Sequence, residues 1–255
     1  MTSVISSEIS TKSMTVPQST PVLNEVSAAV HGERLYPLRS SRIYWHLTCL
    51  RKQMEQVIET FVAGRDRAKL VDYGCGNMPY RALFQPLIQQ YIGVDLPGND
   101  MADVIADDPN RTPLEDESAD LVLSSQVFEH VADPPRYLQE AHRLLKADGL
   151  LILSTHGSWP YHPDPHDFWR WTSEGLKKTI SKAGFEIVYF RGIMGPASSA
   201  IQLWQDAVYR RVRGFFRKPF ARFMQFLIRK ADRACNDEAR DRDASVYMVV
   251  AKRLG

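Results

Sequence analysis

Short apolar runs and helical stretches alternate along the chain from residue 69 onwards. Runs rich in β-branched residues are typical of buried strands, whereas apolar positions three and four residues apart are typical of helices. Strands are predicted near 69–73, 91–95, 102–106, 119–124, 149–155, 185–191 and 245–252, and helices over 80–89, 134–146 and 172–183. This alternation predicts an α/β fold in which crossover helices cover a parallel sheet.

The segment before the first predicted strand divides into two parts. Residues 41–62 carry apolar side chains at three- and four-residue steps, which predicts an amphipathic helix, and Gly64 is placed to end it. Residues 1–34 show neither a helical nor a strand period and are rich in Ser, Thr, Val and Pro, which predicts a flexible N-terminal arm. The folded domain is therefore expected over 35–255, with a helical first part at 35–64.

A helical insertion is expected at 195–242, between the sixth and the last predicted strands. Within it, apolar residues share one helical face, basic residues surround them, and Pro219 suits a helix start. That face is expected to pack on the domain as a lid or to form a homodimer surface. Alternatively, residues 205–233 form an interfacial helix that contacts anionic lipid. The apolar face consists of Phe220, Phe223, Met224, Leu227 and Ile228.

Composition places the chain among ordinary globular domains. Its 255 residues are 44% hydrophobic and 24% charged, which suits one α/β core, and the net charge of +2 favours no particular partner. The three cysteines form no CxxC pair, so neither a disulfide framework nor a metal site is expected. The first residues lack the basic and apolar regions of a signal peptide, and no apolar run is long enough to span a membrane. We therefore expect a cytoplasmic protein, or one at the inner membrane surface.

A glycine-rich turn, Gly74-Cys75-Gly76, follows the first predicted strand, and Asp95 closes the next one. Such a turn lets a ligand approach the backbone, and a carboxylate roughly 20 residues on can accept hydrogen bonds from both ribose hydroxyls of an adenosine. Nicotinamide cofactors require a third glycine in this turn so that the helix can hold a pyrophosphate, but Pro79 stands there. The turn therefore favours an adenosine attached to an amino acid.

The same residues resemble motif I of the class I S-adenosylmethionine-dependent methyltransferases, in the form Asp72-x-Gly74-Cys75-Gly76. Residues 119–131 are similar to the fourth-strand motif of that family, and residues 144–154 to the run into its fifth strand. One departure is Met78, where the family often has glycine. The resemblance implies a Rossmann-like sheet of seven mostly parallel strands with an antiparallel last strand, helices on both faces, and a helical insertion before the last strand.

By this resemblance the cofactor is S-adenosylmethionine, which leaves as S-adenosylhomocysteine. Asp72 and Gly74 would hold its amino-acid portion, Asp95 its ribose, and Asp107 its adenine amino group. The residues that the resemblance assigns to the cofactor are Asp72, Gly74, Cys75, Gly76, Asp95, Leu96, Asp107, Ser125 and Gln126. An acidic residue such as Asp107 can instead simply turn a loop.

Histidines follow the fourth and fifth predicted strands, at the edge of the sheet where ligands bind in open α/β folds. Methyl transfer mainly requires alignment of donor and acceptor, but a hydroxyl acceptor also benefits from a base. His130, His162 and His166 are candidates for that base, with Asp167 in support. Each of these histidines can instead be a structural hydrogen-bonding group.

The loop that contains these histidines resembles a segment of methyltransferases from bacterial polysaccharide and glycolipid pathways. Its aromatic rings would stack on sugar faces, and Arg170 would bind a carboxylate or phosphate. Alternatively, Asp167 and Arg170 pair with each other, and Thr172 is expected to cap the next helix. The expected acceptor-binding residues are His156, Trp159, Tyr161, Arg170 and Trp171.

Three classes of function remain open from the sequence. The favoured one is O-methylation of a sugar, glycan or other small-molecule hydroxyl, with a soluble or lipid-linked acceptor. The alternatives are N-methylation of a small natural product and a non-catalytic adenosine-binding scaffold. An oxidoreductase is disfavoured by Pro79, and no nucleic-acid partner is expected because the Asn/Asp-Pro-Pro-Tyr signature is absent after the fourth predicted strand.

Overall fold

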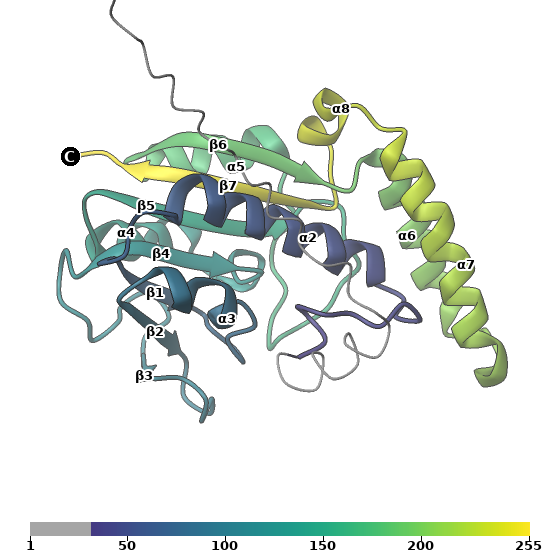
Figure 1. Ribbon diagram of the computed structural model, residues 1–255, viewed down its shortest axis with the longest axis horizontal. Helices are drawn as coiled ribbons and strands as arrows, with labels where there is room; N and C mark the ends of the chain where they lie inside the picture. Colours follow the sequence, from purple (N-terminus) through teal and green to yellow (C-terminus); the bar gives the residue numbers. More distant parts are fainter. Residues whose placement is uncertain (1–31) are drawn as a thin grey trace, which may run out of the picture.

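Seven strands form one sheet in the order β3-β2-β1-β4-β5-β7-β6 (Figure 1). The computed structural model describes residues 32–255, so the expected arm at 1–34 lies almost wholly outside the described residues. Only β7 runs antiparallel to its neighbours β5 and β6, which confirms the predicted topology. The strands are β1 (Lys69–Tyr73), β2 (Gln90–Asp95), β3 (Val104–Ile105), β4 (Ala119–Ser125), β5 (Leu145–His156), β6 (Phe185–Ile193) and β7 (Val246–Arg253).

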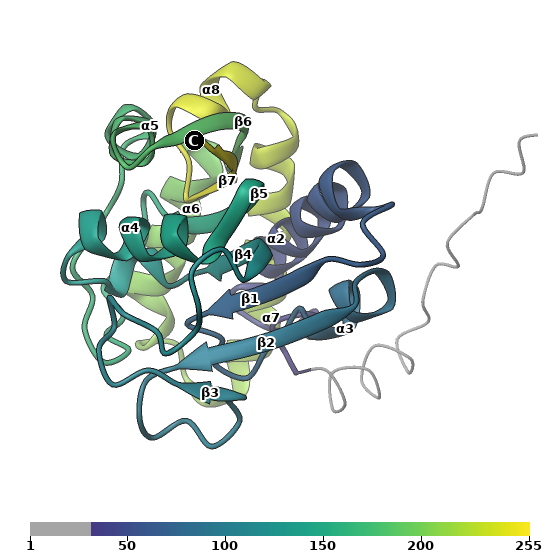
Figure 2. The same cartoon turned by 90° about the vertical axis from the view of Figure 1, so that its left-hand side faces the viewer.

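Helices cover both faces of the sheet (Figure 2). Neighbouring strand residues such as Leu70 and Val71 are both buried but belong to opposite apolar layers, because successive side chains of a strand point to opposite faces. The first layer includes α2 (Tyr44–Val57), its π-helical end (Ile58–Val62) and α3 (Arg81–Phe84), which continues as a 3₁₀ turn (Gln85–Leu87). The second includes α4 (Pro134–Leu144) and α5 (Ser173–Lys182).

Local signals place several helix ends as expected. Gly64 has a φ of +84° just after the π-helical turn, a conformation that glycine adopts without strain. The Thr172 side chain accepts a hydrogen bond from the Gly175 N–H (3.1 Å) and caps α5. The helix predicted over 134–146 is shorter, because β5 begins at Leu145 directly after α4, so Gly149 lies within a strand rather than beyond a helix.

The insertion between β6 and β7 contains α6 (Pro196–Tyr209), α7 (Gly214–Arg233) and α8 (Asp237–Arg242). α7 packs along α6 and against α2. Figure 1 shows α6 and α7 at the end of the molecule towards which β6 points. α7 begins five residues before Pro219, so the predicted start at that proline is wrong. Pro219 is the sixth residue of α7 and has no N–H to donate, so one backbone hydrogen bond of the helix is not made there.

The buried face of α7 also differs from the predicted apolar face. Phe223 is 59% exposed, whereas Gln225 and Asp232 are buried. The Gln225 amide accepts a hydrogen bond from the backbone N–H of Trp45 (2.7 Å), and Asp232 accepts one from the Trp45 indole (2.9 Å). Because polar groups of α2 bond polar residues of α7, the buried face of α7 includes these polar residues and part of the predicted apolar face is exposed. Within residues 32–255, none of the helices combines the length and apolar character needed to cross a bilayer.

Candidate active site

The loops after β1, β2, β4 and β5 meet at the carboxyl edge of the sheet. β1 lies at the centre of the sheet. The chain adds β2 and β3 on one side of β1 and then crosses to the other side to add β4 and β5. In open α/β sheets this switch point is where ligands bind. The predicted cofactor residues lie on or next to these strand ends, except Asp107, which follows β3.

The glycine turn after β1 bends sharply across the end of β2. Gly74 has a φ of +81°, and the Gly74 and Cys75 N–H groups both donate to the Val94 carbonyl oxygen, at 2.9 and 3.0 Å. A Cβ atom on Gly74 would lie 2.7 Å from the Val127 side chain, which belongs to the segment after β4. Glycine is therefore required at this position both by the backbone conformation and by the close approach of Val127.

Asp95 ties the end of β2 to the glycine turn. Its Oδ2 accepts hydrogen bonds from the Gly76 N–H (2.8 Å) and from the Asn99 side-chain amide (2.7 Å), and its Oδ1 accepts one from the Leu96 N–H (2.8 Å). A carboxylate has about four acceptor positions, so Asp95 retains capacity for a further donor. Asn99 also donates to the Gly76 carbonyl oxygen (2.8 Å). The sequence reasoning missed Asn99, which belongs to no motif and lies four residues after the acid.

Asp72 is a buried acid beneath the glycine turn. Burial raises the pKa of Asp72 to about 7, although its hydrogen bond from the Tyr91 hydroxyl (2.6 Å) acts in the opposite direction. A buried carboxylate of this kind becomes fully ionised when a positive charge is placed next to it. The role predicted for Asp72, binding the ammonium end of an amino acid, would use this property.

Met78 stands where the methyltransferase family often has glycine, and its backbone keeps the glycine-like conformation, with a φ of +49°. Its sulfur lies over Gly93 of β2, so close that a Cβ atom on Gly93 would be 2.6 Å away. A bare glycine on the neighbouring strand thus provides the room for the methionine side chain. This pairing of Met78 with Gly93 preserves the shape of the turn.

The remaining predicted cofactor residues lie around the same edge. The Ser125 hydroxyl is 2.9 Å from the Ser154 hydroxyl, and the Gln126 side chain donates to that Ser154 oxygen (3.2 Å), so the ends of β4 and β5 are linked. Leu96 is 39% exposed directly after β2, and Asp107 is exposed in the loop after β3. Both exposed side chains remain available to a ligand.

A buried acid next to His130 forms a hydrogen-bonded network that the sequence reasoning missed. Glu129 lies in a 3₁₀ turn (Phe128–His130) after β4, and its carboxylate binds the His156 Nδ1 (2.5 Å) and the Thr155 hydroxyl (2.9 Å). Burial acts to raise the pKa of Glu129, but the interactions with His156 outweigh this and lower it to about 2. Glu129 is therefore an ionised carboxylate inside the protein. Glu129 could have been identified as a site residue from the sequence, because it directly precedes His130 in the segment that resembles the fourth-strand motif.

The loop after β5 folds back over this turn. The backbone N–H groups of Phe168 and Trp169 donate to the Glu129 carbonyl oxygen, at 2.9 and 3.1 Å. His130 Nδ1 bonds the backbone carbonyl of His166. The folded-back loop brings His162 beside His130, with ring centroids 5.0 Å apart, whereas the His166 side chain is exposed and stays outside this pair.

The expected anion-binding role of Arg170 is wrong, because the alternative pairing with Asp167 is what the structure shows. The guanidinium binds both Asp167 carboxylate oxygens at 2.6 Å, and its other N–H groups donate to the carbonyl oxygens of Trp159, Pro160 and Trp169. All five donors are thereby used. The Asp167 side chain is shielded from solvent and also accepts the His162 backbone N–H (2.8 Å), so this ion pair holds the shape of the loop.

Most of the predicted acceptor-binding aromatic residues pack on other rings. Trp159 lies against His46 and His156, at 4.3 and 5.0 Å between ring centroids, and Trp171 stacks on Phe128 at 4.9 Å. His156 is only 3% exposed, so its predicted direct contact with an acceptor is not what the structure shows. Tyr161, by contrast, is 74% exposed and free to meet a ligand.

Comparison with known proteins identifies the family. Residues 44–189, more than half of the chain, match the model of a methyltransferase domain. This chain belongs to the methyltransferase domain family. The "Probable S-adenosylmethionine-dependent methyltransferase Rv3030" of Mycobacterium tuberculosis (strain ATCC 25618 / H37Rv) is 27% identical over 197 residues, which cover 71% of this chain and 70% of the relative.

Two further relatives show how far the likeness extends. The ubiquinone biosynthesis O-methyltransferase of Cereibacter sphaeroides (strain ATCC 17025 / ATH 2.4.3) is 34% identical over 105 residues, covering 34% of this chain and 40% of the relative. The methyltransferase in a complex with the Trm112 methyltransferase activator of Haloferax volcanii has the same fold, with a TM-score of 0.54, 16% identity and coverage of 91% of this chain and 94% of the other.

The enzyme is an S-adenosylmethionine-dependent methyltransferase, and its carboxyl edge fits that cofactor. In the predicted assignment, Asp95 would accept a hydrogen bond from a ribose hydroxyl, Asp72 would bind an ammonium group, and Gly74 would present bare backbone to the cofactor. When bound, S-adenosylmethionine supplies a methyl group activated by positively charged sulfur. The protein must then hold donor and acceptor in line and exclude water.

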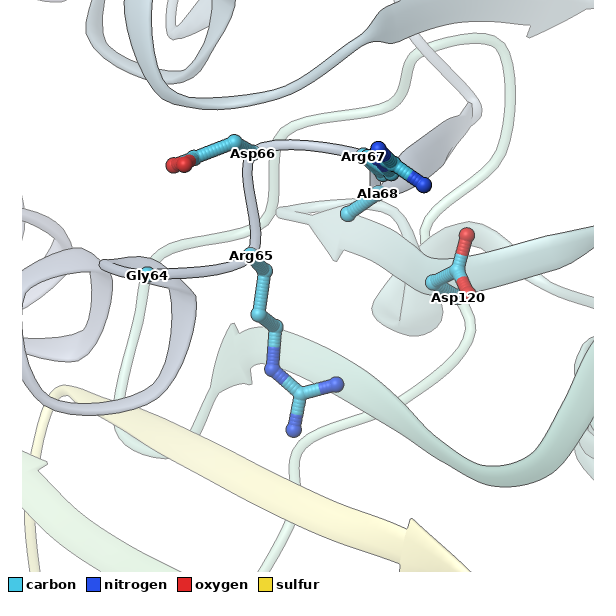
Figure 3. Close-up of a pocket in the computed structure, with 6 residues that line it drawn as sticks. All are labelled: Gly64, Arg65, Asp66, Arg67, Ala68 and Asp120. Atoms are coloured by element: carbon cyan, nitrogen blue, oxygen red, sulfur yellow. The ribbon is translucent and has the colours of Figure 1, made fainter.

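A separate cavity of about 440 Å³ lies at the opposite edge of the methyltransferase sheet (Figure 3). It is lined by the turn before β1, including Arg65 and Asp66, and by Asp120 at the start of β4. The Asp120 carboxylate already accepts the Lys69 N–H (2.8 Å) and binds the Lys146 ammonium (3.0 Å). Since the cofactor residues lie at the carboxyl ends of the strands, this cavity is no part of the active site.

Proposed function

We propose that this methyltransferase methylates a hydroxyl group of a sugar, glycan or other small molecule. The observation that carries the proposal is the position of His162, which the folded-back loop places beside His130 in the turn after β4. A hydroxyl acceptor, unlike a neutral amine, must lose a proton during methyl transfer, so a histidine there has a chemical purpose. O-methyltransferases among the relatives support the same reading.

His162 has the hydrogen bonds and the charge state that activation of a hydroxyl requires. Its Nδ1 lies 3.0 Å from the Pro160 carbonyl oxygen and therefore carries the proton, which leaves Nε2 as an acceptor. Burial and the neighbouring His156 lower the pKa of His162, so the ring is neutral at neutral pH. Its side chain is 36% exposed and can be reached from outside.

Substitution of His162 tests the proposal. We expect His162→Ala to lower kcat by about a hundredfold or more, as is usual for loss of a group that moves a proton, with unchanged affinity for S-adenosylmethionine. Turnover is measured as the mass gain of one methyl group in candidate glycans and metabolites, and affinity by calorimetry. His142→Ala is the control, because this histidine of α4 packs on Phe185 and bonds the Leu254 carbonyl oxygen instead of the residues around His162. Unchanged turnover in His162→Ala would refute the hydroxyl mechanism and favour methylation of a neutral amine.

We also propose that the helical insertion brings the enzyme to an anionic membrane surface, where a lipid-linked acceptor would be found. Aromatic side chains on α6 and α7 remain exposed, with Phe215 at 87% and Trp204 at 56%. Basic residues of α7 surround them, a combination typical of helices that lie in a membrane interface. The exposed aromatic residues are Trp204, Phe215, Phe216, Phe223 and Phe226.

A basic cavity next to these aromatic residues supports membrane contact. It has a volume of about 510 Å³ and lies between the start of α2 and α7. Three arginines line it together with Tyr44 and Phe226. Guanidinium groups bind phosphate well because their planar donors match its oxygens. The arginines of this cavity are Arg39, Arg222 and Arg229.

Vesicle sedimentation tests the membrane proposal. We expect the wild-type protein to bind vesicles with anionic lipid at low salt and to be released at high salt, and Arg222→Glu to weaken binding about tenfold through the reversed charge. Arg65→Glu, at the opposite edge of the sheet, is the matched control. Equal binding to neutral and anionic vesicles, or none to either, would refute the proposal. Concentration-dependent self-association without vesicle binding would identify the face as a dimer surface.

A further inference from the structure

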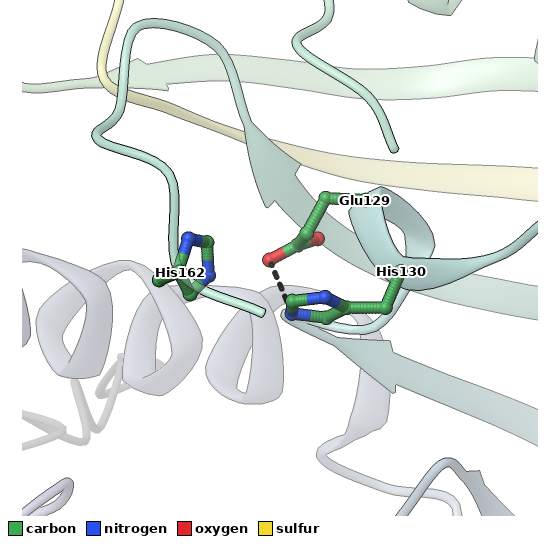
Figure 4. Close-up of side chains that lie close together, drawn as sticks. All are labelled: Glu129, His130 and His162. Atoms are coloured by element: carbon green, nitrogen blue, oxygen red, sulfur yellow. Dashed lines mark ion pairs between the residues drawn. The ribbon is translucent and has the colours of Figure 1, made fainter. Parts of the chain in front are cut away.

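Three side chains with metal-binding atoms converge where the loop after β5 meets the turn after β4. Each of Glu129, His130 and His162 offers one ligand atom, and these atoms all lie within 4.8 Å of one another. Figure 4 shows Glu129 and His130 on the turn and the His162 ring facing them from the loop. Two imidazoles and one carboxylate are a donor set that binds Zn²⁺ and related divalent transition metals.

Hydrogen bonds to the backbone leave the outer nitrogens of both histidines free. His130 Nδ1 bonds the His166 carbonyl oxygen, and His162 Nδ1 bonds the Pro160 carbonyl oxygen at 3.0 Å. A carbonyl oxygen only accepts, so each Nδ1 carries the hydrogen and each Nε2 keeps its lone pair. His130 Nε2 lies 3.8 Å from Glu129 Oε1. Histidines that bind metals are usually oriented by a hydrogen bond of this kind at the other ring nitrogen.

The carboxylate is oriented in the same way. Glu129 accepts hydrogen bonds from His156 Nδ1 (2.5 Å) and the Thr155 hydroxyl (2.9 Å), one at each oxygen. Each oxygen thus retains a lone pair, and the ionised group cannot rotate freely. Exposure completes the arrangement, because the side chains of His130 and His162 are 14% and 36% exposed, whereas Glu129 is buried. A metal ion held here would have open positions towards solvent.

We propose that Glu129, His130 and His162 bind one divalent transition-metal ion, with Zn²⁺ as the preferred probe. Ligand atoms about 2.1 Å from a tetrahedral metal lie roughly 3.4 Å apart, so the cluster closes around an ion by side-chain movements of about 1 Å. Imidazole ligands favour Zn²⁺, Co²⁺ or Ni²⁺ over Mg²⁺, which prefers oxygen ligands and its own water. This assignment departs from the expectation, drawn from the cysteine pattern, that the protein has no metal site.

The consequence for chemistry rests on the hydroxyl acceptor of the proposed function, but the ion takes the lone pair of His162 Nε2, so the proton goes to water and not to that histidine. An acceptor hydroxyl bound to the ion has a lowered pKa and releases its proton to water at the exposed side of the site. The oxygen then forms its bond to the methyl carbon as the carbon–sulfur bond breaks. His130 and His162 activate the hydroxyl through the ion, by holding it in position.

Metal binding is tested without any turnover. The full chain is stripped with a chelator, dialysed against Zn²⁺ alone, and its zinc content is measured together with the thermal midpoint. We expect one ion per wild-type chain and a raised midpoint, and at least tenfold weaker binding in His130→Ala and in His162→Ala. His142→Ala should bind as the wild type does, and Mg²⁺ should bind far more weakly.

The outcomes are separable from those of the proposed function. Absence of zinc from the wild-type chain, or unchanged binding in both histidine variants, would overturn the metal site. If His130→Ala does not fold, His162→Ala decides alone, because that residue lies on a partly exposed loop. Calorimetry of the metal-free protein with S-adenosylmethionine reports cofactor binding independently. Zinc binding without affinity for that donor would instead count against the proposed function.

Discussion

Replacement of Asp95 by alanine is expected to lower the affinity for S-adenosylmethionine by about a hundredfold. One hydrogen bond from a ribose hydroxyl to a charged carboxylate would be lost, worth roughly 1.5–3 kcal/mol. The glycine turn would also lose its anchor, because Asp95 accepts the Gly76 N–H at 2.8 Å and the Asn99 amide at 2.7 Å. Isothermal calorimetry with the donor measures the effect directly.

Asp66→Ala is the control for the Asp95 experiment. Asp66 is exposed in the turn before β1, at the opposite edge of the sheet, and contacts none of the predicted cofactor residues. We expect this variant to bind the donor as the wild type does. If Asp95→Ala bound the donor with wild-type affinity while remaining folded, the ribose would have to lie elsewhere, and the assignment of the whole turn would be wrong.

Replacement of Glu129 by alanine is expected to destabilise the fold by about 2–6 kcal/mol, because it leaves two buried donors without their acceptor, at roughly 1–3 kcal/mol each. His156 and the Thr155 hydroxyl would lose the carboxylate that they bind at 2.5 and 2.9 Å. Chemical denaturation followed by circular dichroism measures the change. Glu55→Ala is the control, because Glu55 makes only a surface pair with Arg51 (3.6 Å) worth little.

The Glu129 contribution should also depend on pH. Its pKa is lowered from 4.5 to about 2 in the folded protein, so the stabilisation is fully present above the unfolded value and is lost as the pH falls towards 2. The difference in unfolding free energy between the wild type and Glu129→Gln should therefore shrink across that range. A constant difference would show that the charge of Glu129 contributes nothing and that packing alone explains its burial.

The candidate site combines two kinds of element with different origins. The cofactor side consists of strand ends and tight turns, where positive φ angles at Gly74, Gly76 and Met78 leave few alternatives for the chain. The predicted acceptor side consists of a long loop held by the Asp167–Arg170 ion pair and by hydrogen bonds to Glu129. We therefore expect methyltransferases with different acceptors to differ in this loop. The glycine turn should be similar in all of them, because they bind the same donor.

Local patterns in the sequence were sufficient for the α/β architecture. Apolar runs at strand spacing and the cap at Thr172 act over a few residues, so all seven strands and the start of α5 were predicted. Boundaries that depend on neighbours were less accurate. β3 pairs at only two positions with β2 at the edge of the sheet, and α4 gives way to β5 at Leu145 because that residue pairs with Ala119.

By itself, the sequence determined the fold class and the cofactor turn, because periodicity, glycine spacing and the acid at Asp95 express local backbone requirements. Only the tertiary structure decided which polar side chains meet. In the folded protein Arg170 bonds Asp167, His156 bonds Glu129, and polar residues of α7 bond α2. Such pairs depend on how distant segments fold together, and buried polar groups take whichever partner that folding supplies. No pattern of nearby residues contains that information.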